Sequence, residues 1–340
     1  RRQRQMCIRD RIRSFLTPGG TDMPAEKVTT VLGEISPEAL GFCQMHEHIM
    51  LRKGVPASLD PALMADDIEK STQELSLLRA AGGCTVVDAQ PIGCGRMAAE
   101  LAEASRRSGI TVIASTGFHV RRFYPSEHWL FDMTETDLEK LFCREITDGM
   151  YENCDLVFSG EATKHRAGIV KAALEERGLG KTERKLFAAA AFAARCCNVP
   201  LMIHTDRDSN PLELMDYLLS CDLPPEQMIF CHLDRTMPNG NVAKTLCAEG
   251  AYLEYDTIGR FKYHSDKEEI RRIEEILDAG WVKRLLLSLD TTNRRMLSYG
   301  GDIGLNYLLQ TFLPAMHNSG ISEAVLERIM RKNPKEVFGS

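Results

Sequence analysis

Short apolar runs recur along the chain, and each is followed by a stretch with the periodicity of a helix. A run of four to eight apolar, often β-branched residues is typical of a strand that is buried on both faces. Eight strands are predicted in this way, over residues 41–49, 85–90, 111–116, 167–173, 200–205, 228–234, 251–257 and 284–290. Helices that cover such strands repeat apolar residues every three to four positions. This pattern is clearest over residues 66–82, 96–109, 183–196 and 267–280.

Strands that alternate with helices pair in parallel, and eight such units close naturally into a barrel. We therefore predict an α/β protein built as a single-domain (β/α)8 TIM barrel. The alternative is an open doubly wound sheet, which usually has a glycine-rich phosphate-binding turn after its first strand. The sequence has no such turn there. Residues 119–160 exceed a normal connection, and we expect them to form helices and a loop over the barrel mouth.

The N-terminus differs from the rest of the chain in composition. Residues 1–22 contain six arginines and two aspartates, so the net charge of −6 for the whole chain becomes −10 for the remainder. We expect residues 1–22 to be a disordered, Arg-rich leader and residues 23–340 to form the barrel. Because an acidic body does not favour contact with polyanions, no nucleic-acid partner is expected.

The composition also indicates the cellular compartment of the protein. No apolar run reaches the roughly 18 residues that span a bilayer, so no membrane partner is expected. The N-terminus lacks the apolar centre of a secretory signal. The eleven cysteines are an odd number without a CxxC pair, which is typical of reduced thiols. We therefore expect a cytoplasmic protein, in which Cys196 and Cys197 pack on a helix.

Candidate chemistry begins with the segment "GFCQMHEHIM" at residues 41–50. Residues i and i+2 of a strand share a face, so His46 and His48 point the same way and Glu47 points the other way. Imidazole is a strong ligand for zinc-like ions, and such a pair can hold one ion from a single strand. The spacing alone leaves ordinary core histidines as an equal alternative.

Further polar residues lie in or at the ends of other predicted strands, namely Lys171, His204, His232 and Asp290. The carboxyl ends of barrel strands meet at one face, where barrel enzymes place their active sites. Burying these groups without partners would cost roughly 1–3 kcal/mol for each unsatisfied group. A metal centre removes that cost, so the arrangement predicts metal binding.

Lys171 is unusual in such a set because an ammonium group repels cations. Its amine can react with carbon dioxide to give a carbamate, an anionic group with two oxygens that can bridge two ions. Two alternatives remain open for this residue. It could form a salt bridge to Asp290, or it could act as a covalent nucleophile in a Schiff-base lyase.

Longer segments carry a family resemblance. They are "VTTVLGEISPEALGFCQMHEHI" (28–49), "AGIVKAAL" (167–174), "VPLMIHT" (199–205), "FCHLD" (230–234), "LLLSLD" (285–290) and "NPKEVF" (333–338). This ordered set resembles the phosphotriesterase family of the amidohydrolase superfamily. The resemblance implies a TIM barrel with two divalent metal ions, usually Zn2+, with Mn2+ or Co2+ as further options, and a possible homodimer.

The resemblance also implies a role for each ligand. His46, His48 and Asp290 would hold one ion, His204 and His232 the other, and carbamylated Lys171 would bridge both. A hydroxide held between the ions would attack the substrate because metal binding lowers the pKa of water from 15.7 to about 7. Asp290 would be the catalytic residue that orients the hydroxide, takes its proton and passes it to the leaving alkoxide.

The family contains phosphotriesterases, lactonases and proteins without an assigned substrate. "YDTIGRFKYHSDKE" (255–268) and "DTTNRRMLSYGG" (290–301) look more like members that act on small or phosphorylated sugar lactones. We therefore expect a hydrolase of lactones or related carboxylic esters with a small-molecule substrate. The alternatives are phosphotriester cleavage, the Schiff-base lyase through Lys171, and a metal-binding barrel without catalysis.

The loops after the last two strands contain basic and aromatic residues, where barrels often bind phosphate. Our hypothesis is an anion pocket; the alternative is ordinary solvated charge. The candidate substrate-binding residues are Arg260, Lys262, Tyr263, Arg294 and Arg295.

Two aspartates are candidates for orienting the ligands. Asp234 follows His232 by two positions, on the same face of the predicted strand. Asp256 matches a position that relatives often follow with a basic residue, but Thr257 stands here, which puts the family's proton relay in doubt. In the loop after the third strand, His119, Tyr124 and His128 could line the barrel mouth, but we expect each of them to be a surface residue.

Overall fold

Eight parallel strands surround a common axis in the computed structural model, which describes residues 27–339. Their order is β10-β9-β8-β7-β6-β5-β4-β3. The bounds are β3 Cys43–Glu47, β4 Thr85–Asp88, β5 Thr111–Gly117, β6 Ala167–Leu174, β7 Leu201–Thr205, β8 Met228–Cys231, β9 Tyr252–Tyr255 and β10 Leu285–Leu287. Every neighbouring pair in this order is parallel.

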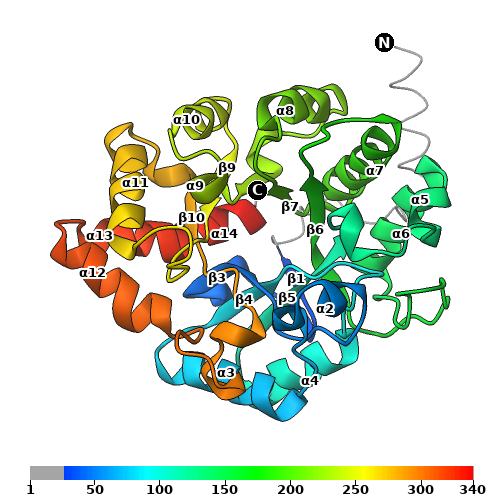
Figure 1. Cartoon of the computed structure of the whole chain (residues 1–340), viewed down its shortest axis with the longest axis horizontal. Helices are drawn as coiled ribbons and strands as arrows, with labels where there is room; N and C mark the ends of the chain where they lie inside the picture. The colour runs from blue at the N-terminus through cyan, green and yellow to red at the C-terminus, as the bar shows by residue number, and fades with distance from the viewer. Residues whose placement is uncertain (1–26, 340) are drawn as a thin grey trace, which may run out of the picture.

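The first and last strands meet at the remaining seam. Glu47 and Thr291 form a parallel bridge there, and the Asp290 amide donates a hydrogen bond to the His46 carbonyl at 3.0 Å. The His46 amide donates to Ser288 Oγ at 2.8 Å. These contacts bring β3 and β10 together, so the sheet forms a nearly closed barrel and the predicted TIM-barrel fold is confirmed (Figure 1).

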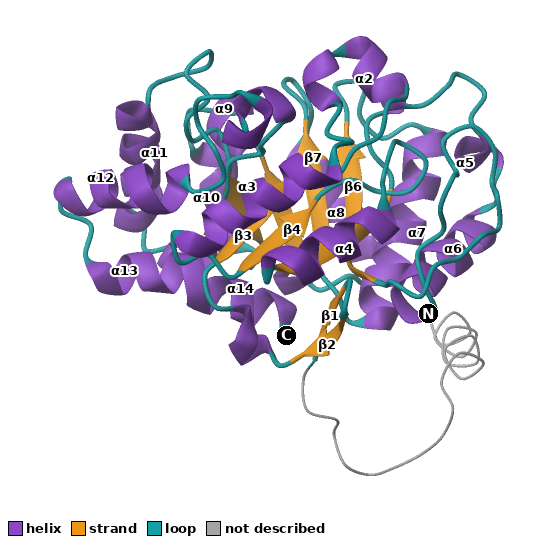
Figure 2. Cartoon of the chain, turned by 90° about the horizontal axis from the view of Figure 1, so that it is seen from below, coloured by secondary structure: helices purple, strands orange, loops and turns teal. Residues whose placement is uncertain are grey.

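Helices between the strands form an outer layer (Figure 2). Their bounds are α2 Val55–Leu59, α3 Ile68–Ala80, α4 Ala98–Ser108, α5 Trp129–Asp132, α6 Glu135–Thr147, α7 Lys181–Cys197, α8 Pro211–Ser220, α9 Leu233–Thr236, α10 Asn241–Ala248, α11 Asp266–Asp278, α12 Leu313–Asn318, α13 Glu323–Glu327 and α14 Asn333–Phe338. Short 3-10 turns cover Pro37–Leu40, Pro61–Leu63, Arg121–Phe123, Pro225–Gln227, Val282–Arg284, Asn293–Arg295 and Leu297–Tyr299, and π-helical turns cover Leu308–Phe312 and Arg328–Lys332.

Side-chain caps define several helix starts. Asp67 accepts hydrogen bonds from the amides of Glu69 and Lys70 at the start of α3, and Ser265 accepts one from the Glu268 amide at the start of α11. Such oxygens satisfy backbone donors that have no partner inside the helix. These caps explain why α3 and α11 begin within a few residues of the predicted positions.

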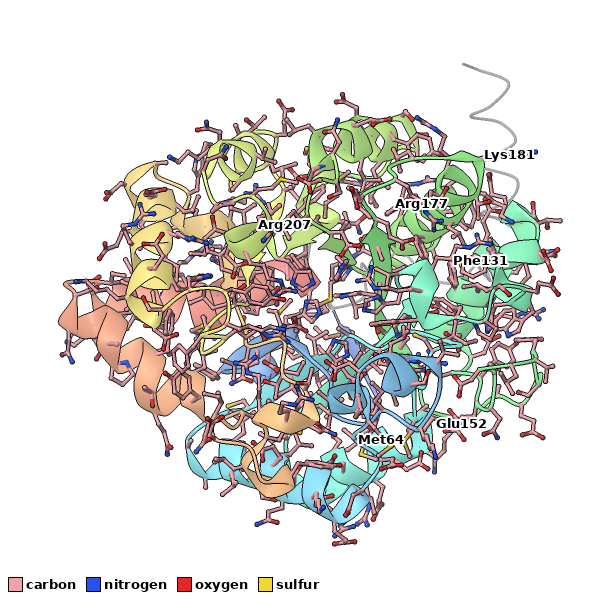
Figure 3. All side chains as sticks on the ribbon, in the orientation of Figure 1. Met64, Phe131, Glu152, Arg177, Lys181 and Arg207 are labelled. Carbon is pink, nitrogen blue, oxygen red and sulfur yellow. The ribbon has the colours of Figure 1, made fainter. Side chains whose placement is uncertain are left out.

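Two apolar layers hold the barrel together. One fills its interior with residues such as Met45, Ile113, Met202 and Leu286, none of which is exposed. The other joins the outer strand faces to the helices. At the amino ends of the strands, a hairpin of β1 Val28–Thr30 and β2 Gly33–Ile35 lies close to α14 (Figure 2). Figure 3 draws the side chains on the ribbon, with Lys181, the first residue of α7, at the outer edge of the molecule. The opposite end of the barrel, where the strands have their carboxyl ends, is not covered by this hairpin.

Several expectations need comment. The strand expected over residues 228–234 ends at Cys231, and α9 begins at Leu233. The long connection over residues 119–160 does contain helices, α5 and α6, although α6 packs against α7 in the outer layer. The expected leader lies outside the described residues. Within residues 27–339, no helix has the length and apolar character needed to cross a bilayer.

Candidate metal centre

The polar residues predicted to converge lie at the carboxyl ends of five strands. His46, Lys171 and His204 belong to β3, β6 and β7. His48 and His232 come directly after β3 and β8, and Asp290 lies in the loop that follows β10, which ends at Leu287. His232 and Asp290 have positive φ angles of 68° and 49°. Non-glycine residues in this region are uncommon and cluster at functional sites, because the surrounding structure must maintain the strain.

The six side chains contact one another. Lys171 Nζ lies 3.0 Å from His46 Nε2, and His232 Nε2 lies 2.8 Å from His204 Nδ1. Asp290 Oδ1 lies 3.4 Å from His48 Nε2 and 3.9 Å from His46 Nε2. The ligand atoms of His46, His48 and Asp290 are close enough together to share one ion.

Each of the four imidazoles has one nitrogen held by an outer partner. His46 Nδ1 bonds Glu254 Oε2 at 3.0 Å, and His48 Nδ1 bonds Gln90 Oε1 at 3.1 Å. The other two pairs are His232 Nδ1 with Asp256 at 2.7 Å and His204 Nε2 with Asp206 Oδ1 at 2.9 Å. If each outer partner accepts the ring proton, the opposite nitrogen of each histidine is the one that would bind a metal ion.

This pattern fits a metal centre. A ligating histidine usually donates its second ring N–H to a carboxylate or carbonyl group, which fixes its tautomer and orientation. Burial lowers the pKa of His46 and His232 well below the ordinary value, and it lowers that of His204 to about 4. These three imidazoles are therefore neutral near pH 7, and the neutral form is the one that binds metal. The donor set of nitrogens and carboxylate oxygens suits zinc-like ions.

Lys171 is fully buried. Its Nζ contacts His46 Nε2 and, at 3.5 Å, Met202 Sδ, and within residues 27–339 it forms no ion pair with a carboxylate. The salt bridge to Asp290 that the sequence left open is therefore absent. Burial lowers the pKa of this amine because desolvation disfavours the ammonium form. A neutral amine is the form that can add carbon dioxide.

The Asp290 carboxylate has two different sides. Its Oδ1 faces the histidines, whereas its Oδ2 accepts ion pairs from Arg235 at 3.1 Å and Arg260 at 3.0 Å. Burial raises the pKa of this carboxyl, but the Arg260 charge, the His48 hydrogen bond and the Arg235 charge hold it well below its ordinary value. Asp290 is therefore ionised, with its orientation fixed from behind.

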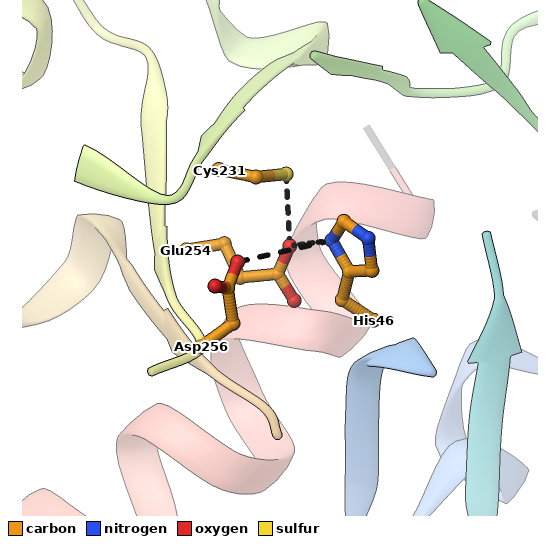
Figure 4. Close-up of side chains that lie close together, drawn as sticks. All are labelled: His46, Cys231, Glu254 and Asp256. Carbon is orange, nitrogen blue, oxygen red and sulfur yellow. Dashed lines mark hydrogen bonds and ion pairs between the residues drawn. The ribbon is translucent and has the colours of Figure 1, made fainter. Parts of the chain in front are cut away.

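Sequence reasoning missed the residues that support the ligands. They are Gln90, Asp206, Arg235 and Glu254. Arg235 bridges Asp256 and Asp290, and Glu254 also accepts a hydrogen bond from Cys231 Sγ at 2.9 Å (Figure 4). Gln90, Asp206 and Glu254 follow or lie in strands, so their positions near the site were a usable signal. Arg235 directly follows the predicted strand over residues 228–234, so its position was a usable signal too, although the turn into α9 that directs it to Asp290 was not predicted.

The two expected supporting aspartates behave differently. Asp256 bonds His232 directly, as a residue that orients a ligand must. Asp234 lies in α9, so it does not share a strand face with His232 as predicted. Its Oδ2 accepts hydrogen bonds from the amides of Asp256 and Thr257 at 2.9 and 2.7 Å. Asp234 therefore holds the backbone of Asp256 rather than a ligand.

A cavity of about 320 Å³ opens above the six side chains. All of them except Lys171 line it, together with four basic residues, Arg260, Lys262, Arg294 and Arg295. Tyr263 does not line the cavity; it lies under Lys262, whose Nζ is 4.8 Å from the ring centroid. The structure thus brings four of the five candidate substrate-binding residues to one wall.

Three expectations about the loop after β5 are wrong. His119, Tyr124 and His128 are 5%, 4% and 1% exposed, so they are buried rather than surface residues. Tyr124 and His128 pack on each other, with ring centroids 4.8 Å apart. His119 lines the cavity. A sequence pattern cannot show this, because the loop folds back over the barrel only through these tertiary contacts.

Fold and site together define a class, that of TIM-barrel hydrolases with clustered metal-ligand side chains at the carboxyl ends of their strands. Residues 26–338 match the model of the phosphotriesterase family, which is metal-dependent, and the chain belongs to that family.

Several known proteins that are similar to this chain are named as hydrolases or lactonases. Phospho-furanose lactonase of Mycoplasmopsis synoviae is 29% identical over 322 residues, which cover 91% of this chain and 90% of that protein. N-acetyltaurine hydrolase of Xenopus tropicalis is 26% identical over 351 residues, covering 91% and 97%. The crystal structure of a lactonase from Listeria monocytogenes has a TM-score of 0.83 at 25% identity, covering 92% and 98%. The protein is therefore an enzyme that hydrolyses ester or amide bonds.

Proposed function

We propose that the protein is a binuclear metal-dependent hydrolase that opens a lactone or a related carboxylic ester. One observation carries the proposal: four histidines, each with an outer hydrogen-bond partner, lie together with an aspartate and a lysine below a cavity that basic residues line. The relatives of this chain include phospho-furanose lactonase. A phosphorylated sugar lactone is the substrate that we favour.

The ligands divide into two groups. His46, His48 and Asp290 would hold one ion, and their donor atoms lie close together. His204 and His232 would hold the other. Lys171, after addition of carbon dioxide, would bridge the two. Zn2+ suits these donors best, and Mn2+ or Co2+ can occupy similar ligands. Two such ions supply a water of lowered pKa and a Lewis acid for the acyl oxygen.

Asp290 is the catalytic residue of this proposal. Its Oδ1, which faces His46 and His48, would orient the attacking water and take up its proton. Arg235 and Arg260 hold Oδ2, so the carboxylate cannot turn away. Because these charges keep the pKa of Asp290 low, the carboxyl readily releases the proton to the leaving alkoxide.

The basic wall of the cavity, formed by Arg260, Lys262, Arg294 and Arg295, would attract an anionic substrate. Arg260 is bonded to Asp290, and Arg295 donates to the carbonyls of Ile258 and Leu289. Lys262 and Arg294 are exposed, and a phosphate group would bind to them, in the case of Arg294 in competition with Asp60, which lies 3.5 Å from its guanidinium group. Because phosphorylated metabolites are charged and do not cross bilayers, such a substrate also supports a cytoplasmic location.

A second candidate is hydrolysis of an acylated amino sulfonate. N-acetyltaurine hydrolase matches most of this chain, and a sulfonate is an anion that the same wall could bind. Phosphotriesters are neutral and have no need of that wall, which makes phosphotriesterase activity the weaker alternative. Lys171 neither lines the cavity nor is exposed. A Schiff-base lyase, which requires the lysine to reach the substrate, is disfavoured for this reason.

The test compares four substrates on zinc- and manganese-loaded protein: a phosphorylated furanose lactone, its unphosphorylated counterpart, N-acetyltaurine and a paraoxon-type triester. We expect the highest kcat/KM for the phosphorylated lactone and loss of activity after chelation. The double variant Lys262→Ala/Arg294→Ala should raise KM for the phosphorylated lactone far more than for the unphosphorylated one. Equal effects on both, or a preference for the triester, would contradict the proposal.

A further inference from the structure

His119 is a polar residue of the cavity wall that the proposed centre does not use. Its side chain is 5% exposed and lines the cavity. The ring centroid lies 5.2 Å from that of His204 and 6.4 Å from that of His48. Within residues 27–339, however, His119 belongs to no group of donor atoms close enough to share an ion.

The backbone fixes the tautomer of this ring. The Val120 amide donates a hydrogen bond to His119 Nδ1 at 2.7 Å. A nitrogen that accepts such a bond has no proton, so the ring is neutral and its proton is on Nε2. In the described part of the chain, Nε2 has no hydrogen-bond partner. It is also not one of the fully buried polar atoms without a partner. Nε2–H therefore faces the open space of the cavity.

We propose that His119 donates a hydrogen bond from Nε2 to the acyl oxygen of the substrate, where negative charge develops during attack. This inference rests on the proposed function and deepens it. The His119 ring lies near His48 and His204, one histidine from each ligand group. In the proposed function the reacting carbonyl lies between these groups, within reach of a donor on this ring. No proton is transferred from His119, and Nε2 keeps its hydrogen throughout.

Neighbouring contacts hold the donor in place before the substrate binds. The ring packs against Phe123, with centroids 4.6 Å apart, and the His119 amide donates to Tyr124 Oη at 2.9 Å. A donor that is already oriented stabilises developing charge without reorganisation, and removing one such donor typically lowers kcat about 100- to 1000-fold. His119 is thus a catalytic residue that sequence analysis placed on the surface.

The experiment compares His119→Phe and His119→Gln in the metal-loaded enzyme. Phenylalanine removes the donor, whereas the glutamine amide can restore one near the position of Nε2. We expect kcat for the lactone to fall about 100-fold or more in His119→Phe and clearly less in His119→Gln, with KM little changed. Phe261→Leu is the matched control, because Phe261 is another apolar residue that lines the cavity, and the change leaves both the donor and the Phe123 ring that packs on it intact. An equal loss of kcat in this control would overturn the proposal.

Further readouts exclude other roles. With aryl esters, the fold loss in His119→Phe should be the same for good and poor leaving groups; a loss confined to poor ones would mean that His119 protonates the leaving group. Metal content should not change, and a fall would make His119 a ligand. In the holoenzyme with 15N-labelled histidine, long-range NMR correlations should show the neutral Nε2–H tautomer, assigned by its absence in His119→Phe. An Nδ1–H tautomer would refute the inference.

These outcomes separate the two proposals. If the wild-type enzyme does not turn over the lactone, the proposed function fails, and an NMR tautomer with the proton on Nδ1 would independently refute the inference. If the wild-type enzyme is active and His119→Phe retains its kcat, only the role of His119 fails.

Discussion

At the scale of single residues, the site depends on which nitrogen of each imidazole is free. The outer partners decide this, and they come from distant parts of the chain: Glu254 is 208 positions from His46, and Gln90 is 42 positions from His48. The sequence could predict the ligands, because each is an unusual polar residue at a strand end. It could not predict the partners, since only the closed barrel brings them near.

Lys171 gives the most direct residue-scale prediction. Replacing it with Met removes the amine and any carbamate while keeping an apolar side chain in a buried position, so we expect bound metal to fall from two ions per chain to one or none. Lys171→Glu supplies a carboxylate in place of the carbamate and should keep more metal. Elemental analysis of purified protein measures both.

The carbamate itself can be detected by NMR. Protein exchanged with 13C-labelled carbon dioxide should give a carbamate carbon signal in the wild type that is missing in Lys171→Met. A wild-type protein that holds two ions without this signal would show that the lysine acts unmodified.

At the scale of elements, a close approach between β5 and β6 positions the lysine. Gly117 has a φ of 101°, and a Cβ there would lie 2.0 Å from the Lys171 carbonyl oxygen. Only glycine fits, because any side chain would push β6 away and move Lys171 with it. The amide of Phe118 then donates to the same carbonyl at 2.9 Å. The end of β5 thus supports the site without contributing a ligand.

We predict that Gly117→Ala lowers the free energy of unfolding by about 3 kcal/mol or more, because backbone strain and steric overlap add. Gly109→Ala is the control: its φ of 72° is also positive, but nothing lies within 4 Å of the new Cβ. It should cost only about 1 kcal/mol. Urea denaturation measures both. Equal losses would show that the contact with Lys171 is unimportant.

Strand interiors were predictable from sequence, whereas their ends were not. Apolar runs identified all eight barrel strands because each is buried on both faces. At residues 228–234, however, the apolar pattern continues through Leu233 although the strand ends at Cys231. His232 has a positive φ there, which turns the chain into α9. That turn directs Arg235 toward Asp290, a contact that no strand pattern could indicate.

At the scale of the whole molecule, the barrel gathers residues from positions 46 to 290 at one face. Parallel pairing alone ensures this, because it places every strand's carboxyl end on the same side. The family match spans residues 26–338, so the whole barrel is shared with the family. The expected homodimer stays a prediction, as does the boundary between the leader and the barrel.

The central claim is that six side chains hold two divalent ions. Anomalous diffraction at the absorption edge of the bound metal, from crystals of the metal-loaded protein, tests it most directly. The account predicts two peaks, one beside His46, His48 and Asp290 and the other beside His204 and His232, with density bridging from Lys171. No peak among these side chains, or a single peak elsewhere, would contradict it.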